Sequence, residues 1–249
     1  MNADEVTRRH LTDLADRAYS RNIVVYSDFL DLHELHILQC LRVEHMGVSL
    51  SFSGGYDAAE RQMAAFLPDA LVFETNFPLD CVSIVPLQEK YAEPLTHRDY
   101  LGALMHIGLE RSCLGDILMD GAKAYVFCAQ KMTPVILDEI TRVRHTPVKA
   151  AVERPETIPE PKYKVVSGTV SSLRLDSVTA LAFGLSRSKA VPYIEGGSVY
   201  VNGRQILSNG YTLQEGERIS VRGVGKCQFL GVRNQSKKGK QWIELLRYI

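Results

Sequence analysis

The residues best suited to bind an anion are four cations in one short stretch of the chain: Arg174, Arg187, Lys189 and Arg204. Arg187 and Lys189 follow Ser186, a residue type that caps helix N-termini. Two cations in the first turn of a helix oppose its dipole and do little for stability alone. They become favourable if a phosphate sits there, because free backbone N–H groups and cationic side chains then converge on it. The stretch therefore predicts a phosphate-binding site.

Two short helices and a hairpin must position these cations. The sequence predicts, in order, a helix over Leu175–Phe183, a second helix from Ser186 to the glycine pair 196–197, a strand over 198–201 and a hairpin turn at Asn202-Gly203. Gly184 is a natural C-cap for the first helix. Pro192 lies inside the second helix and should bend it or shift its start, since proline has no N–H to donate.

The order and spacing of these residues resemble a known RNA-binding module. The strings R-L-D, S-R-S-K-A and I-x-x-G-x-V-x-V-N-G-R are similar to the alpha-L motif, or S4 domain, over roughly residues 170–232. The segment Glu215-Gly216-Glu217 departs from the Gly-Asp that is more usual in that family. The resemblance implies these candidate RNA contacts: Arg174, Ser186, Arg187, Ser188, Lys189, Asn202 and Arg204. Taken alone, Ser186 could simply cap a helix whose cations face solvent; the whole constellation favours RNA.

Acidic and basic residues are unevenly divided along the chain. Residues 1–161 hold 15 Lys and Arg against 24 Asp and Glu, a net charge of −9. Residues 162–249 hold 14 against 5, a net charge of +9. This asymmetry predicts a polyanion-binding module attached to an acidic body. Lys237, Lys238 and Lys240 should form a hairpin tip that adds salt-sensitive attraction to phosphate, although an ordinary solvated turn would have the same composition.

Length and composition exclude several classes of protein. The 249 residues allow two or three domains. No run approaches the roughly 20 apolar residues of a membrane span, and the charged N-terminus lacks an apolar signal core, so a cytoplasmic protein without membrane contact is expected. The five scattered cysteines contain no C-x-x-C pair, which indicates reduced thiols. His33 and His36 could form half a metal site but have no ligand cluster beside them, so neither a metal nor another cofactor is expected.

Upstream of the basic module, strand and helix signals alternate. The predicted elements are strands at 71–74 and 81–85, a helix at 96–107, strands at 117–119 and 124–127 joined at Asp120-Gly121, a helix at 131–143 and a strand at 147–151. From the strand at 81–85 onward, this βαββαβ order is that of a ferredoxin-like or RRM-like fold. Tyr125 and Phe127 would share one face of the sheet and could stack bases, although such pairs are more often core.

These elements give an α+β fold class with four segments. The predicted parts are an N-terminal α/β domain (1–69), an RRM-like domain (70–151), a linker rich in proline and glutamate (152–161) and the S4 module with its β-hairpins (162–249). Within the first domain, the sequence favours a strand over 48–52, a turn at Gly54-Gly55-Tyr56 and a helix over 57–66. The turn resembles a phosphate cradle only loosely.

Three further strings extend the family resemblance over nearly the whole chain: SGGYDAAER at 53–61, HRDYLGALMHIGLER at 97–111 and GDIL at 115–118. With the C-terminal module they resemble the YlmH family of bacterial RNA-binding proteins. The resemblance implies ribosomal RNA as partner, on a large ribosomal subunit that carries a stalled peptidyl-tRNA, and a link to cell division. His97 and Arg98 could contact RNA at the start of a helix, or the local residues could only cap that helix.

Enzyme signatures are incomplete in this chain. His106-Ile107-Gly108 matches part of the HIGH signature of aminoacyl-tRNA synthetases, but Leu109 replaces the second histidine. Asp176 stands in an R-L-D context like that of pseudouridine synthases, yet no catalytic domain follows, so it is expected to cap or pair within the module. We therefore expect a non-catalytic RNA-binding protein without a small-molecule substrate, with tRNA as a possible further contact. Two alternatives stay open: an RNA-modifying enzyme with a site in residues 1–150, seeded by His97, Arg98 and Asp99, and a cell-division adaptor.

Overall fold

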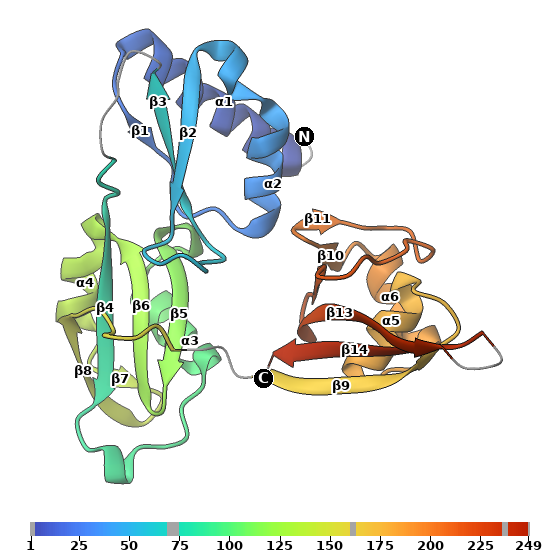
Figure 1. The fold of residues 1–249 in the computed structure, drawn as a ribbon. Helices are drawn as coiled ribbons and strands as arrows, with labels where there is room; N and C mark the ends of the chain where they lie inside the picture. The colour runs from blue at the N-terminus through green and yellow to red at the C-terminus, as the bar shows by residue number, and fades with distance from the viewer. Residues whose placement is uncertain (1–2, 69–74, 160–162, 236–238, 249) are drawn as a thin grey trace. The chain divides into compact units, whose positions relative to one another are not determined.

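The chain forms two compact units, Met1–Pro159 and Glu160–Ile249, and each is described by itself (Figure 1). The computed structural model describes residues 3–68, 75–159, 163–235 and 239–248. Both units combine helices with antiparallel sheets, so the fold class is α+β, as the sequence predicts. Within the described ranges, none of the helices has the length and apolar character needed to cross a membrane.

The first part of the N-terminal unit packs two helices against a three-stranded sheet. Its elements are α1 (Ala3–Arg21), β1 (Val25–Tyr26), α2 (Leu32–Leu41), the 3-10 turn η1 (Val43–Met46), β2 (Val48–Ser53) and β3 (Met63–Pro68). The strands pair antiparallel in the order β1-β3-β2. On α1, Leu11, Leu14 and Ala18 recur at helical spacing and are buried in one cluster with Phe66 of β3. The apolar stripe of α1 therefore holds this helix to the sheet.

The structure corrects the helix predicted over residues 57–66. After β2 the chain turns, and Met63–Pro68 becomes β3, the central strand of the sheet. Every side chain of β3 is buried. A short, fully apolar run fits a buried strand as well as a buried helix by periodicity alone. The flanking strands β1 and β2, which supply hydrogen bonds on both sides, make it a strand.

The second part of the N-terminal unit is a five-stranded sheet with helices on one face. Its elements are β4 (Leu79–Pro86), η2 (Glu89–Tyr91), α3 (His97–His106), η3 (Arg111–Cys113), β5 (Leu114–Asp120), β6 (Lys123–Ala129), η4 (Gln130–Met132), α4 (Thr133–Glu139), β7 (Arg142–Val143) and β8 (Thr146–Val152). The strand order is β5-β6-β4-β8-β7. Tyr100 and Leu104 of α3 and Ile136 of α4 are buried against Val82 and Val126 of the sheet. These contacts place α3 and α4 on the same face.

The strand predicted at 71–74 lies outside the described residues. The helix predicted over 131–143 is too long: α4 covers only Thr133–Glu139, with Pro134 in its first turn, where a missing N–H costs nothing. The last two residues of the predicted helix, Arg142 and Val143, instead form β7 and pair with β8. Val143 is fully buried there, so packing against the sheet outweighs continuation of the helix.

The C-terminal unit is a six-stranded sheet that carries two helices. Its elements are β9 (Tyr163–Val170), α5 (Leu175–Phe183), α6 (Arg187–Glu195), β10 (Val199–Val201), β11 (Arg204–Gln205), β12 (Arg218–Val221), β13 (Gly225–Gln235) and β14 (Gln241–Tyr248). The strand order is β11-β10-β12-β13-β14-β9. Leu175 and Val178 of α5 and Ile194 of α6 share a core with Phe229 and Leu245 of the sheet. Each helix of this unit thus contributes to one continuous core.

The predicted bounds of α5, the cap at the start of α6 and the turn after β10 are confirmed. Helix α5 has the predicted bounds and ends at Gly184, whose φ of 64° is left-handed. Helix α6 starts after Ser186 as predicted, and Pro192 does not shift that start. Asn202 and Gly203, with φ of 49° and 80°, form the two-residue turn between β10 and β11. Positive φ at both turn positions is the geometry that an Asn-Gly pair favours.

Candidate nucleic-acid interface

The N-terminus of α6 presents the predicted cations at the surface. The Ser186 hydroxyl accepts a hydrogen bond from the backbone N–H of Lys189 at 3.3 Å, which caps the helix. It also lies 2.9 Å from the Ser188 hydroxyl. Arg187 and Lys189 fall in the first turn and are exposed, and the Lys189 side chain has no partner among the described residues. The end of the helix that attracts anions is therefore also flanked by positive charge.

A buried carboxylate links this turn to the start of α5. Asp176 accepts hydrogen bonds from Arg174, with Nε at 3.3 Å and Nη2 at 3.2 Å. It also accepts one from Arg187 Nη2 at 2.6 Å. The Asp176 side chain is 4% exposed, whereas those of Arg174 and Arg187 are 44% and 54% exposed. Asp176 thus pairs within the module, as its sequence context predicts, and the two arginines share it while keeping much of their surface in solvent.

The electrostatics of Asp176 follow from this geometry. Burial by itself raises the pKa of a carboxyl group. At Asp176 the hydrogen bonds and charges of Arg174 and Arg187 outweigh burial and lower the pKa to about 2. The carboxylate therefore stays ionised at neutral pH. Three charged groups, two positive and one negative, leave a net positive charge on this cluster.

The chain after the β10–β11 hairpin returns to the same place. The backbone N–H of Leu175 donates to Tyr211 O at 2.8 Å, and Arg174 forms an isolated antiparallel bridge with Thr212. The positive charge of Arg204 acts on the phenol of Tyr211, where it opposes the rise in pKa that burial and Glu217 cause. The loop 208–213 therefore connects the neighbourhood of Arg204 with that of Arg174.

The remaining predicted contacts fall in three groups. Asn202 has an internal role, because its side-chain oxygen accepts a hydrogen bond from the backbone N–H of Arg218 at 2.9 Å. Lys240 is exposed next to β14, whereas Lys237 and Lys238 lie outside the described residues. His97 and Arg98 are exposed at the start of α3, in the other unit of the chain.

Asp99, one of the three residues that seed the enzyme alternative, has a structural role. Asp99 accepts hydrogen bonds from the Thr96 hydroxyl at 2.7 Å and from the Thr96 backbone N–H at 2.8 Å. The first of these contacts, then the second, lowers the pKa of Asp99, which weakens it as a base. The described residues contain no group of three or more His, Cys, Asp or Glu arranged to hold a metal ion. Capping of α3 thus accounts for Asp99.

The aromatic pair of the middle sheet is not available for stacking. Tyr125 and Phe127 lie on the face opposite α3 and α4 and are 6% and 1% exposed. Phe29 and Met63 from the first part of the unit pack against them. The favoured interpretation from the sequence, that the pair belongs to the core, is therefore confirmed, and the weaker possibility that this face offers exposed aromatics to RNA is wrong.

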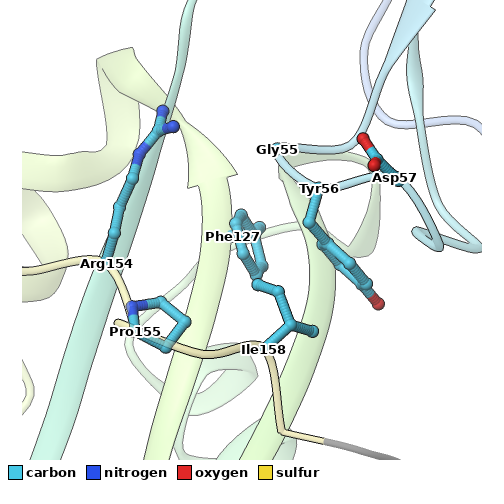
Figure 2. A pocket seen from close by; sticks show the side chains of 7 residues that line it. All are labelled: Gly55, Tyr56, Asp57, Phe127, Arg154, Pro155 and Ile158. Atoms are coloured by element: carbon cyan, nitrogen blue, oxygen red, sulfur yellow. The ribbon is translucent and has the colours of Figure 1, made fainter.

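A shallow pocket of about 300 Å³ lies at this covered face. Figure 2 shows Phe127 between Tyr56 and the segment that carries Pro155 and Ile158, with the Arg154 side chain extending away from them. The ring centroids of Tyr56 and Phe127 are 5.1 Å apart. Because the Phe127 ring is almost wholly buried, it offers little surface to a base in this pocket.

The three strings that extend the family resemblance converge in space, which the sequence analysis missed. The Asp116 carboxylate of GDIL accepts hydrogen bonds from the Tyr56 hydroxyl at 2.8 Å and from the backbone N–H groups of Glu60 and Arg61 at 2.7 and 3.2 Å. Arg61 Nε and Arg111 Nη1 both donate to the carbonyl of Leu114. The available signal was the presence of charged and aromatic residues such as Tyr56, Arg61 and Asp116 in these strings. The hydrogen bonds of these residues join the two parts of the N-terminal unit.

Burial explains the electrostatics of this junction. It lowers the pKa of Arg61, and together with the charge of Arg61 it lowers the pKa of Arg111 to about 10. Both guanidinium groups donate to main-chain carbonyls, including that of Phe29 at 2.8 Å from Arg61 Nη2. These two cations are thus engaged inside the protein.

Comparison with known protein families shows the class of protein to which this chain belongs. Residues 173–219 match the S4 domain, so the chain is an S4-domain RNA-binding protein. Residues 2–70 match the N-terminal domain of YlmH, and residues 74–156 match the RNA-binding domain in YlmH. The chain belongs to the YlmH family.

Two known proteins resemble this chain, one in sequence and one in fold. The ribosome-associated protein quality control protein P2 of Bacillus subtilis (strain 168) is 33% identical over 224 residues, which cover 86% of this chain and 83% of that protein. A solved structure, the cell division protein ylmH from Streptococcus pneumoniae, superposes with a TM-score of 0.53 at 19% identity, covering 62% of this chain and 93% of that one. The second likeness shows a shared fold.

Proposed function

We propose that this protein is a non-catalytic, cytoplasmic RNA-binding protein. It binds structured ribosomal RNA of the large subunit, beside a peptidyl-tRNA. The observation that carries the proposal is the cluster of Arg174, Arg187 and Lys189 around Asp176 and the α6 N-terminus. The family membership and the name of the Bacillus subtilis relative support a ribosomal target. The net charge of +9 on residues 162–249 supports contact with a polyanion.

In this proposal the C-terminal unit reads RNA shape and phosphates. Arg174, Arg187, Lys189 and Arg204 contact backbone phosphates, and the lysines Lys237, Lys238 and Lys240 add salt-dependent attraction. Ser186, Ser188 and Asn202 shape the surface that holds these cations. Contacts of this kind fix the position of a protein on folded RNA and carry little base selectivity.

We also propose that residues 70–151 form an RRM-like domain, flanked by an N-terminal domain (1–69), a linker (152–161) and the S4 module (162–249). The strand order β5-β6-β4-β8 with α3 and α4 on one face supports the RRM-like assignment. Since Tyr125 and Phe127 are buried, this domain would contact RNA through exposed side chains such as His97 and Arg98. If this domain does not contact RNA, it serves as a spacer in the chain between the N-terminal domain and the S4 module.

The test measures binding of the full chain to purified large ribosomal subunits. The double variant Arg187→Ala/Lys189→Ala should bind at least about tenfold more weakly, and the slope of log affinity against log salt should fall by about two, one for each lost phosphate contact. The matched control is Arg8→Ala/Arg9→Ala, which removes two exposed cations from α1. Unchanged affinity and slope in the first variant would rule out this site.

Three further outcomes distinguish the proposal from its two alternatives. Loss of a specific modified nucleotide from ribosomal RNA in cells that lack the protein would favour an RNA-modifying enzyme. Sedimentation of the protein away from large subunits in a low-salt sucrose gradient would favour a cell-division adaptor. Comigration that high salt or nuclease abolishes would favour the RNA-binding proposal.

A further inference from the structure

Asp176 is a negatively charged residue that contacts two of the cations proposed to bind RNA, Arg174 and Arg187. Its side chain is almost wholly buried, while both of its arginine partners are about half exposed. A carboxylate close to a phosphate repels it, so charge alone makes Asp176 unfavourable for RNA binding. If this site binds RNA, Asp176 must therefore have another effect that outweighs the repulsion between its carboxylate and a phosphate.

The contacts of Asp176 restrict where both guanidinium groups can lie. Arg174 engages both carboxylate oxygens through Nε and Nη2, a bidentate arrangement that fixes the plane of its guanidinium group. Arg187 donates to Oδ2 at 2.6 Å, from a position eleven residues further along the chain. The Asp176 carboxylate is itself held by the Ser177 hydroxyl at 3.2 Å. One buried group thus fixes two long side chains that come from different helix starts.

Both arginines keep unused donors. A guanidinium group carries five N–H donors. The contacts to Asp176 take two donors from Arg174 and one from Arg187, and neither side chain has another hydrogen-bond partner among the described residues. The unused N–H groups are available to solvent on the half-exposed arginines. Phosphate oxygens are the acceptors that such planar, fixed donors bind best.

We propose that Asp176 is a positioning residue, which holds Arg174 and Arg187 side by side as a preformed receptor for one RNA backbone phosphate. This inference rests on the proposed function. Without the carboxylate, each arginine would sample many rotamers and lose that freedom on binding, which weakens the complex. The carboxylate therefore strengthens RNA binding although its charge opposes it.

The sign of one substitution tests the proposal. Asp176→Asn removes a negative charge, so a purely electrostatic site predicts tighter binding of purified large ribosomal subunits. Positioning predicts the opposite, a loss of about fivefold to tenfold in affinity. The matched control is Glu215→Gln, which removes the same charge from an exposed position in the same unit and should bind equally well or slightly more tightly. Equal or tighter binding by Asp176→Asn would overturn the proposal.

A second variant covers the case in which Asp176→Asn fails to fold. Arg187 is half exposed, and Arg187→Lys keeps its charge while losing the planar fork that can hold Asp176 and a phosphate together. It should fold normally and bind several-fold more weakly. Binding by Arg187→Lys as strong as that of the natural protein would contradict positioning, because charge alone would then suffice.

A background variant distinguishes positioning from a general structural effect. In the presence of Arg174→Ala/Arg187→Ala, the change Asp176→Asn should cause no further loss of affinity, since no arginines remain to be held. An equal loss in both backgrounds would overturn the proposal. If Arg187→Ala/Lys189→Ala leaves binding intact, the proposed function fails at this site; if that variant weakens binding but Asp176→Asn does not, only the positioning role fails.

Discussion

The hydroxyl oxygen of Tyr56 lies 2.8 Å from a carboxylate oxygen of Asp116, 60 positions further along the chain. The same carboxylate accepts from the backbone N–H groups of Glu60 and Arg61. Burial, followed by the charge of Asp116, raises the pKa of Tyr56, so the phenol stays protonated and donates. This contact fastens the loop after β2 to strand β5 and thereby joins the two parts of the N-terminal unit.

Removal of this hydroxyl should weaken the N-terminal unit. We expect Tyr56→Phe to lower its free energy of unfolding by about 1.5 to 3 kcal/mol, because a hydrogen bond to a charged acceptor is lost and Asp116 keeps only its backbone donors. Chemical denaturation followed by circular dichroism measures the change. Tyr19→Phe is the control, since the side chain of Tyr19 is 63% exposed and should leave stability unchanged. Equal stability of both variants would show that the contact contributes nothing.

Gly102 offers a stabilising substitution. It lies in the middle of α3, and a Cβ atom built there meets no other atom within 4 Å. Gly102→Ala should therefore raise the free energy of unfolding by up to about 1 kcal/mol, because glycine has a low helix propensity. A thermal melt that shifts downward in Gly102→Ala would contradict the open environment seen here.

Gly55 should respond in the opposite direction. Its φ is +93°, and a Cβ atom there would lie 2.4 Å from Cδ1 of Phe127, whose ring is buried. We expect Gly55→Ala to destabilise the N-terminal unit by at least about 2 kcal/mol through backbone strain and overlap. Circular dichroism melts compare it with Gly102→Ala, which adds the same methyl group. A decrease in unfolding free energy no larger than that of an ordinary surface substitution would contradict this prediction. The loop that carries Gly55 and Tyr56 would then rearrange without cost.

Acid should weaken the C-terminal unit through Asp176. Its pKa is lowered to about 2 in the folded protein, from 3.8. A group whose folded pKa is depressed stabilises the fold above its unfolded pKa and loses that contribution as pH falls through the folded value. The contribution is about 2 kcal/mol at neutral pH and should disappear between about pH 4 and pH 2.

The single tryptophan, Trp242, lies in β14 and reports unfolding of this unit by fluorescence. The measurement compares the natural protein with Asp176→Asn across pH. The difference in unfolding free energy should be constant at neutral pH and shrink below about pH 4. A difference that stays constant down to pH 2 would contradict the depressed pKa.

Local signals in the sequence determined much of the C-terminal unit. The bounds of α5, the cap at Ser186 and the turn at Asn202-Gly203 depend on the conformational preferences of a few neighbouring residues, and each is found where the sequence places it. The division of charge between the two parts of the chain is also a property of the sequence alone. Caps and turns are set by interactions within a few residues, so they can be predicted without knowledge of the fold.

Only the tertiary structure decided what the apolar and charged groups of distant segments do. Residues 63–68 become a strand because β1 and β2 lie on either side, and Tyr125 and Phe127 are buried because Phe29 and Met63 cover them. In the same way, Asp176 joins Arg174 to Arg187, and Asp116 joins Tyr56 to β5. Such contacts depend on which segments meet in space, and hydrophobic burial is not directional, so residue type and periodicity alone do not specify them.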